Sequence, residues 1–536
     1  MPGAALTEIT RVPVPIVDED AGTIKTVGIE ATVDAQYLVC TIEIPDSDTA
    51  QFSVGSNNLG ETAPTYISSA ACAIATPVTM AGIGFPDVHL IMSVRDFVTL
   101  SVDDYNLDAI SVYPNIVIAY AMVKLACARA NNQLGLLDND IYHPIVAACE
   151  RIINGEFHDQ FIVEIIQGGA GTSTNMNANE VIANVALELI GKEKGEYETI
   201  SPLNHVNMSQ STNDTYPTAL LVGFLKEYDP LLEAIKSLSE SFHAKGVEFA
   251  DVIKMGRTQL QDAVPMSLGQ EFTAFGNTLL DDIKRLNEMS QLFLEVNLGA
   301  TAIGTGINSH LDYPKIAVEA LADLSGLPLV LAPNPIAATS DTSAFVSFSS
   351  VLKRVAIKLS KISNDLRLLS SGPIAGFNEI NLPAVQAGSS IMPGKVNPVI
   401  PEAVNQTAFQ VIGNDLVITL AAEAGQMQLN AFEPVLAVNI LRSLRYMTNA
   451  MVMLRTKCVN GITANVEVCA KYVEQSPGIA TFFTPHLGYK ESARIAKKSL
   501  ADGVTVREII IKEGLMTEEQ VNEVLHVDNL TKPNIQ

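Results

Sequence analysis

The 536 residues of this chain leave room for several packed units, and length alone suggests about three to four. The formal net charge is −25, which argues against nucleic acid or an anionic membrane as a partner, because both attract basic surfaces. Hydrophobic residues make up 47% of the chain and charged residues only 17%, which is more apolar than a lone globule requires. We therefore expect extensive contacts between subunits.

The six cysteines are scattered, with no CxxC pair and no histidine at metal-ligand spacing. This pattern predicts free thiols in a reducing cytoplasm, not disulfides or a zinc site. Residues 1–22 contain neither a basic segment nor an apolar one, so no secretory signal is predicted. Residues 66–86 are uncharged but rich in small polar residues and interrupted by Pro77, which disfavours a membrane helix.

The N-terminal region, residues 1–110, is predicted to be partly β. Between Thr23 and Val54, short β-branched runs alternate with polar turns, which is typical of strands. Near Pro114 the pattern changes to long apolar segments with few interior glycines or prolines. The change predicts a domain boundary between residues 85 and 110.

Residues 111–462 are predicted to form long helices, several of them above twenty residues. Such helices do not suit a compact α/β domain, so we expect a long bundle whose apolar faces also meet those of other subunits. Residues 463–536 are predicted to form a small helical C-terminal domain. The predicted helices cover residues 179–194, 217–249, 261–296, 342–369, 401–424 and 434–458, and in the tail 466–474, 490–501 and 517–525.

The segment 388–402, GSSIMPGKVNPVIPE, has the composition of a catalytic loop. Ser389 and Ser390 follow a glycine that can adopt a positive φ, and Lys395 with Asn397 could bind an anion. Serine, glycine and proline are also common in turns, so an ordinary connection between helices remains an alternative reading.

Three further segments are dense in small polar groups: GGAGTSTNMNANE at 168–180, VNMSQSTNDTYPTA at 206–219 and MGRTQLQDAVPMSLGQE at 255–271. The first two lead into helices, whose free N–H groups and positive dipole end attract carboxylates or phosphates. Helix capping explains one or two of the polar residues in each, but not a run of them. The third segment is also compatible with an ordinary polar lead-in to a helix.

Together, the four segments offer many neutral hydroxyl and amide donors and one lysine, without a visible carboxylate pair or a serine–histidine pair. A glycosidase or an aspartic protease requires two positioned acids, and a serine hydrolase requires a histidine. Several preorganised donors suit a different reaction, in which a proton leaves the carbon next to a carboxylate. The resulting enediolate carries extra negative charge that such donors stabilise.

The motifs resemble those of the aspartase/fumarase superfamily. GSSIMPGKVNP resembles its signature, and GGAGTSTNMNANEV, QSTNDTYPTA and GRTQLQDAVP resemble its other motif regions, so that the resemblance covers residues 115–536. The variants GAGTS, QSTND, GRTQLQDAVPMSLGQEF and NPVIPE are similar to the aspartase branch. Class II fumarases usually carry GSGT, QSSND, GRTHLQDATP and NPTQCE there.

The resemblance implies a mainly α fold: a long aspartase/fumarase-like helical bundle, a small helical C-terminal domain, and a divergent N-terminal region. It implies reversible deamination of L-aspartate to fumarate and ammonia, without an organic cofactor or a visible metal-ligand set. It also implies a cytoplasmic homotetramer whose active sites each draw on three subunits. No nucleic acid or membrane is expected as a partner.

The resemblance also assigns roles to residues at matching motif positions. Ser389 would act as the base and take the proton from Cβ. The remaining residues would bind the substrate: Thr172, Ser211, Thr212 and Thr258 the β-carboxylate, Lys395 and Asn397 the α-carboxylate, Asn213 the amino group, Ser390 through its backbone, and Gln259 at the position where fumarases have histidine.

Two departures from the family pattern bear on these expectations. Gln259 replaces the histidine of fumarases, which favours ammonia over hydroxide as the leaving group, because hydroxide needs a general acid more. Residues 1–85 match no family segment, and the N-terminal arm usual in the family is reduced to a faint similarity at 87–97. Two alternatives stay open: a class II fumarase, and a non-catalytic structural or binding relative.

Overall fold

The computed structural model describes residues 109–386, 388–392 and 394–533, and the backbone of four strands nearer the N-terminus. The chain divides into two compact units. The first comprises Met1–Val112 with Asp159–Gln167, and the second comprises Tyr113–His158 with Gly168–Gln536. The predicted boundary between residues 85 and 110 falls almost wholly outside the described residues.

The first unit contains an antiparallel sheet of four strands in the order β1-β2-β3-β4. Its register pairs Val14 with Val27 and Cys40 with both Ala31 and Phe52. Strands β2, β3 and β4 lie in the segment where the sequence predicted strands. The strands are β1 (Thr10–Asp18), β2 (Thr23–Asp34), β3 (Tyr37–Ile42) and β4 (Ala50–Gly55).

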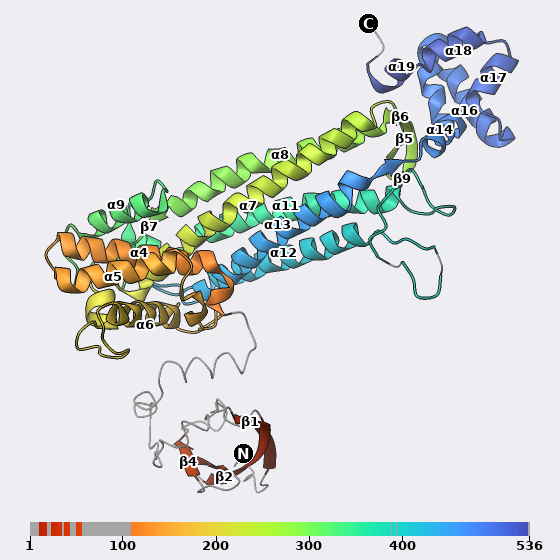
Figure 1. Cartoon of the computed structure of the whole chain (residues 1–536). Coiled ribbons are helices and arrows are strands. Elements are labelled where there is room, and N and C mark those ends of the chain that lie inside the picture. Colours follow the sequence, from red (N-terminus) through yellow and green to blue (C-terminus); the bar gives the residue numbers. More distant parts are fainter. Residues whose placement is uncertain are drawn as a thin grey trace, which may run out of the picture. The chain divides into compact units, whose positions relative to one another are not determined.

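The described part of the second unit contains five long helices that run side by side as an elongated bundle (Figure 1). Helix α11 packs on α8 and α12, and α13 packs on α12 and α7. Aromatic rings such as Phe224, Phe293 and Phe345 meet in the bundle core, with centroid distances of 5.7 to 6.0 Å. The helices are α7 (Thr212–Glu248), α8 (Leu268–Ser290), α11 (Ser343–Leu369), α12 (Val399–Glu423) and α13 (Glu433–Lys457).

Shorter helices surround one end of the bundle, where α7 begins (Figure 1). Helix α4 packs on α5, α7 and α9, and α5 packs on α6. A short parallel pair, β7 with β8, lies in this part of the chain. The elements are α4 (Pro114–Gln133), α5 (Asn139–Ile153), α6 (Thr172–Leu189), η3 (Pro202–Val206), η4 (Gln291–Leu294), β7 (Glu295–Val296), α9 (Tyr313–Ser325), β8 (Val330–Leu331) and α10 (Pro335–Ser340). Helix η1 (Ile110–Val112) belongs to the first unit, and η2 (His158–Gln160) lies where the chain passes from the second unit to the first.

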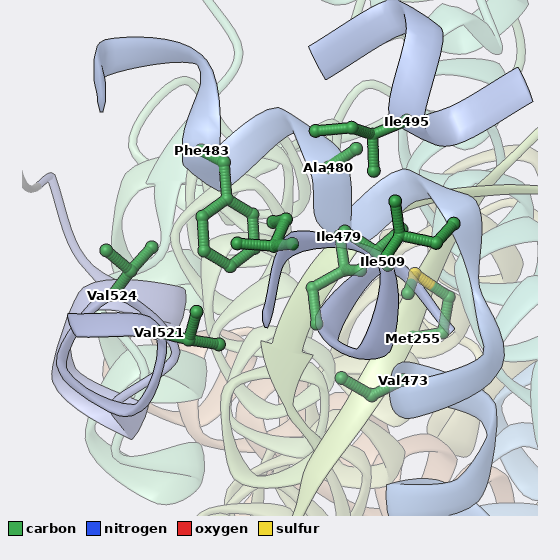
Figure 2. Packing of buried hydrophobic residues seen from close by; sticks show 11 residues of the cluster. Met255, Val473, Ile479, Ala480, Phe483, Ile495, Ile509, Val521 and Val524 are labelled. Atoms are coloured by element: carbon green, nitrogen blue, oxygen red, sulfur yellow. The ribbon is translucent and has the colours of Figure 1, made fainter. Parts of the chain in front are cut away.

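At the other end, where α7 finishes, a hairpin and a cluster of small helices follow (Figure 1). The small helices share a buried apolar core with Phe483, Ile495 and Val521, and Met255 of the hairpin packs into it (Figure 2). The elements are β5 (Ile253–Thr258), β6 (Gln261–Ser267), β9 (Ile380–Asn381), η5 (Val459–Gly461), β10 (Thr463–Ala464), α14 (Val466–Gln475), η6 (Pro477–Phe483), α15 (Thr484–Leu487), α16 (Tyr489–Asp502), α17 (Val506–Lys512), α18 (Glu518–Val524) and α19 (Val527–Thr531).

The helix predicted over residues 261–296 is wrong at both ends. Gln261–Ser267 forms strand β6, and α8 begins only after Ser267, whose hydroxyl accepts a hydrogen bond from Gln270 N at 3.0 Å. Gln270 Oε1 accepts one from Ser267 N in return, at 3.0 Å, so a capping box decides where the helix starts. Past Ser290 the chain forms η4 and β7.

Helices α6 and α7 begin earlier than predicted, at Thr172 and Thr212 instead of 179 and 217. Their polar first turns carry no apolar periodicity, which is the signal that the sequence prediction used. No helix in the described part of the chain is long and apolar enough to cross a membrane.

Candidate active site

Two of the polar segments meet at the starts of α6 and α7. Thr172 is the first residue of α6 and follows Gly171, whose φ is +87°. A Cβ atom on Gly171 would lie 2.4 Å from the ring of Tyr216 in α7, so the backbone of one helix start touches the other helix. Ser211 caps α7 by accepting a hydrogen bond from Asn213 N at 3.2 Å. The structure therefore brings Thr172, Ser211, Thr212 and Asn213 to one place, where two helix N-termini favour an anion.

Residues 297–302 wrap around the start of α7, a contact that the sequence analysis did not predict. Asn213 donates a side-chain hydrogen bond to Ala302 O at 2.7 Å. The buried carboxylate of Asp214 accepts hydrogen bonds from Gly299 N at 2.9 Å and Thr301 N at 3.1 Å. Burial raises the pKa of Asp214 to about 6, although these N–H donors act in the opposite direction. Asp214 thus acts as a structural link between the loop and the helix.

Behind the helix starts lies a buried lysine, Lys124 of α4, that the sequence analysis also missed. Its ammonium group donates hydrogen bonds to Asn175 Oδ1 at 2.6 Å, Gln210 Oε1 at 2.8 Å and Asn207 Oδ1 at 3.1 Å. Burial lowers the pKa of Lys124 to about 8. The available signal was a single lysine inside the apolar run NIVIAYAMVKLACA. This network holds α4, α6 and the turn before α7 together.

The loop at 388–397 lies at the opposite end of the bundle. The Ser389 hydroxyl oxygen accepts hydrogen bonds from Ile391 N at 3.2 Å and Met392 N at 3.0 Å. Asn397 donates a side-chain hydrogen bond to Gly388 O at 2.6 Å, which closes the loop on itself. The side chains of Ser390 and Lys395 are exposed. Two backbone donors on one hydroxyl oxygen would stabilise the negative charge of a deprotonated serine.

Thr258 and Gln259 lie at the turn between β5 and β6, at the same end of the bundle as the loop. Both are exposed, and Gln259 has a φ of +54°. Arg257, one residue earlier, is held by the carboxylate of Glu379 at 2.7 Å. The hairpin therefore projects Thr258 and Gln259 from a rigid base.

Within one chain, the predicted site residues form two groups that do not meet. Helix α7 has 37 residues, and its rise separates the helix starts from the hairpin and the Ser389 loop by roughly 55 Å. No group of three or more His, Cys, Asp or Glu side chains in the described residues could hold a metal ion. The two groups offer hydroxyls, amides, backbone N–H groups and one exposed lysine, a set suited to a dicarboxylate.

Comparison with known families shows to which protein family this chain belongs. A family model described as Lyase matches residues 97–413, which is more than half of the chain, and one described as Fumarase C C-terminus matches residues 479–532. The chain belongs to this lyase family. The predicted superfamily and the predicted mainly helical fold are thereby confirmed.

Sequence identity to relatives differs between the aspartate ammonia-lyase and fumarase branches of this family. An aspartate ammonia-lyase from Pseudomonas aeruginosa is 58% identical over 438 residues, which cover 81% of this chain and 92% of the relative. A solved fumarate lyase:delta crystallin from Brucella melitensis, bound to cobalt, is 54% identical with a TM-score of 0.79 and covers 81% of this chain and 94% of its own. A solved class II fumarase from Schistosoma mansoni is 33% identical with a TM-score of 0.76, covering 81% and 95%. The fold is common to both branches, whereas sequence identity is higher to the ammonia-lyase.

Proposed function

We propose that the chain is an aspartate ammonia-lyase, a carbon–nitrogen lyase that converts L-aspartate reversibly to fumarate and ammonia. Identity of 58% to a named aspartate ammonia-lyase, against 33% to a class II fumarase, supports this reaction over malate dehydration. Gln259 supports it as well, because departure of ammonia from a protonated amine needs no general acid at that position.

Ser389 is the proposed base, and the hydrogen bonds to its hydroxyl oxygen carry this assignment. The N–H groups of Ile391 and Met392 point at the oxygen that would hold the alkoxide charge. The alkoxide takes the Cβ proton of aspartate, and the electron pair of the C–H bond spreads onto the β-carboxylate as an enediolate. When that electron pair returns to form the carbon–carbon double bond, the C–N bond breaks and ammonia leaves.

The remaining predicted residues are proposed to bind the substrate around this base. The helix starts of α6 and α7 supply hydroxyl and N–H donors, which suits an enediolate because preorganised donors stabilise developing charge. The assignments are Thr172, Ser211, Thr212 and Thr258 to the β-carboxylate, Lys395 and Asn397 to the α-carboxylate, Asn213 to the amino group, Ser390 through its backbone N–H, and Gln259 beside Thr258.

A homotetramer with shared sites is proposed, because one chain holds the two groups of site residues far apart. Several copies must therefore meet to complete a site. Helix α12 supports such assembly: Phe409, Leu416 and Leu420 lie on one face and are each about 60% exposed in the single chain. The described cysteines, Cys127, Cys149, Cys458 and Cys469, are buried free thiols, which supports the proposed cytoplasmic location.

The Ser389→Ala variant tests the proposed base. We expect the rate of fumarate formation from aspartate to fall by about 10³-fold or more, because a positioned base contributes about 10² to 10⁴. Subunit assembly and thermal stability should stay as in the wild type, since Ser389 lies in an exposed loop. The matched control is Ser390→Ala, which keeps the backbone N–H and should retain activity. Substantial turnover by folded Ser389→Ala protein would exclude Ser389 as the base, and malate assays with both proteins would reveal a fumarase.

A further inference from the structure

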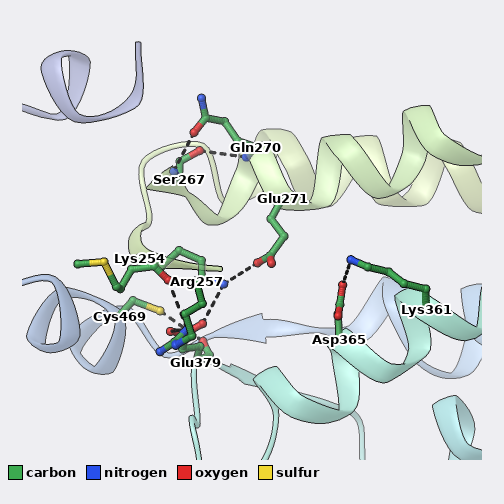
Figure 3. Close-up of polar contacts among 10 residues, drawn as sticks. Lys254, Arg257, Ser267, Gln270, Glu271, Lys361, Asp365, Glu379 and Cys469 are labelled. Carbon is green, nitrogen blue, oxygen red and sulfur yellow. Dashed lines mark hydrogen bonds and ion pairs between the residues drawn. The ribbon is translucent and has the colours of Figure 1, made fainter. Parts of the chain in front are cut away.

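Glu379 places a fully buried carboxylate between two cations at the junction of β5 and β9. Arg257 Nη1 lies 2.7 Å from its Oε1, and Lys254 Nζ lies 3.0 Å from its Oε2 (Figure 3). The side chain of Glu379 is 0% exposed, and that of Lys254 is 3% exposed. Loss of one partner from such a group leaves an uncompensated buried charge, which costs more than loss of a surface ion pair.

The same two cations extend the cluster to other elements. Lys254 also pairs with Glu271 of α8 at 2.7 Å. The guanidinium group of Arg257 lies 4.2 Å from the centroid of the Phe377 ring and 5.6 Å from that of Tyr472 in α14. The Glu379 cluster, defined as Lys254, Arg257, Glu271 and Glu379, therefore joins the hairpin, the bundle and the segment before the Ser389 loop.

The backbone of Glu379 is fixed as firmly as its side chain. Its N–H donates to Leu369 O at 2.9 Å, at the end of α11, and its carbonyl accepts from Asn465 N at 2.9 Å. Beyond β9 the chain becomes exposed: Ile391 is 82% and Met392 48% exposed. Glu379 is thus the last strongly anchored charged residue before the loop that carries Ser389.

We propose that Glu379 is a positioning residue. Its buried carboxylate holds the chain segment that leads into the Ser389 loop against strand β5 and, through Lys254, against helix α8. It touches no proposed substrate-binding atom and acts through two segments: the one that leads to Ser389 and, through Arg257, the hairpin that carries Thr258. This inference rests on the role proposed for Ser389. Displacement of a catalytic group by about 1 Å can reduce the rate on the order of 100-fold. A shift of the segment that leads from Glu379 to Ser389 would therefore lower turnover.

Glu379→Gln is the test variant, and Asp282→Asn is its matched control. The amide keeps the shape of the carboxylate but removes the charge between the two cations. Asp282 of α8 is also a fully buried carboxylate between two cations, with Arg354 Nε at 3.1 Å and Lys358 Nζ at 3.0 Å, but it lies within the bundle. Both variants should lower the melting temperature, Asp282→Asn by less, because Arg354 is 43% and Lys358 20% exposed whereas Lys254 is only 3% exposed.

Only Glu379→Gln should change catalysis. We expect its kcat to fall by about tenfold or more and its KM to rise by a smaller factor, because Thr258 also shifts, while Asp282→Asn keeps both constants within about twofold. A structural probe is available because the sequence contains no tryptophan. Ile391→Trp introduces a single tryptophan, whose emission is separable from that of the tyrosines, at an exposed position of the loop. Its emission maximum and quenching by iodide should change when Glu379→Gln is added and stay constant when Asp282→Asn is added.

The proposal is overturned if folded Glu379→Gln protein matches Asp282→Asn in kcat and in tryptophan emission. Should Glu379→Gln fail to fold, Lys254→Gln decides, because it removes the ion pairs of Lys254 with Glu271 and Glu379 and keeps the Arg257–Glu379 pair. That variant is expected to show the same changes at smaller size, and wild-type kinetics and emission in it would overturn the proposal. Tryptophan emission is measured without turnover, so it tests the anchoring of the loop even if Ser389 is not the base. Activity of the Ser389→Ala variant would refute only the assignment of the base.

Discussion

At the scale of single residues, the buried acid Glu433 at the start of α13 contributes to the pH dependence of stability. Its side chain is buried, and its Oε2 atom has no hydrogen-bond partner among the described residues. Burial raises the pKa of Glu433 to about 8. The folded protein therefore holds this proton at pH values where the unfolded chain releases it. The resulting contribution to stability is complete below about pH 4.5 and is lost as the pH rises to about 8.

Glu433→Gln should remove this pH dependence, because the amide is neutral and similar in shape. At pH 5 we expect the variant and the wild type to have similar unfolding free energies. At pH 8.5 the variant should be more stable by a few kcal/mol. Folding of the wild type at that pH requires Glu433 either to stay charged in a buried position or to take up a proton far above its ordinary pKa. Urea unfolding at the two pH values measures the difference, and an equal difference at both would contradict the assignment.

The lysine of the loop, Lys395, is expected to act mainly in substrate binding. Lys395→Ala removes one charge-assisted contact to the α-carboxylate, which is worth about 1.5 to 3 kcal/mol. We expect KM for aspartate to rise by roughly 10-fold to 100-fold with a smaller change in kcat. Steady-state kinetics measure both constants, and an unchanged KM would remove Lys395 from the carboxylate site.

At the scale of elements, the close approach of α6 to α7 depends on Gly171. An alanine there would need a positive φ, and its Cβ would overlap the Tyr216 ring. Gly191, after the end of α6, has a φ of +73° with nothing within 4 Å of its Cβ position. Alanine variants of the two glycines therefore distinguish the cost of a positive φ, which both share, from the cost of steric overlap, which only Gly171 adds.

Gly191→Ala should cost about 1 kcal/mol, the usual penalty for a left-handed residue with a side chain. Gly171→Ala should cost about 1 to 3 kcal/mol more and raise KM for aspartate, because overpacking pushes apart the helix starts that hold Thr172 and Ser211. Denaturant unfolding and kinetics of both variants test this. Equal stability and equal KM would show that the helix contact is unimportant.

At the scale of the whole molecule, activity should depend on assembly through α12. Leu416→Glu places a charge on the exposed apolar face of this helix, where we expect burial between copies to make it costly. The control is Leu500→Glu in α16, where the leucine is 71% exposed. Leu416→Glu should shift the solution mass toward smaller species and lose activity at the same time, as measured by analytical ultracentrifugation and assay. Full-size, active Leu416→Glu protein would contradict shared sites.

Much of the fold and of the candidate site was predictable because it depends on local sequence. Long apolar segments without interior breaks predict long helices, and the glycine-rich polar segments mark the helix starts and the Ser389 loop. The errors lie at helix ends, as at Ser267 and Thr212, because a capping box is decided by side-chain geometry and not by apolar periodicity. The predicted roles of the site residues stay predictions.

What the sequence determined by itself is the family, the helical bundle and the chemistry that its polar segments offer. The tertiary structure decided where those segments lie, at opposite ends of α7, and which distant groups hold them. Arg257 and Glu379 are 122 residues apart, and Lys124 and Asn175 are 51 apart. Such pairs leave no local pattern in the sequence, because burial brings them together only when the helices pack and water is removed.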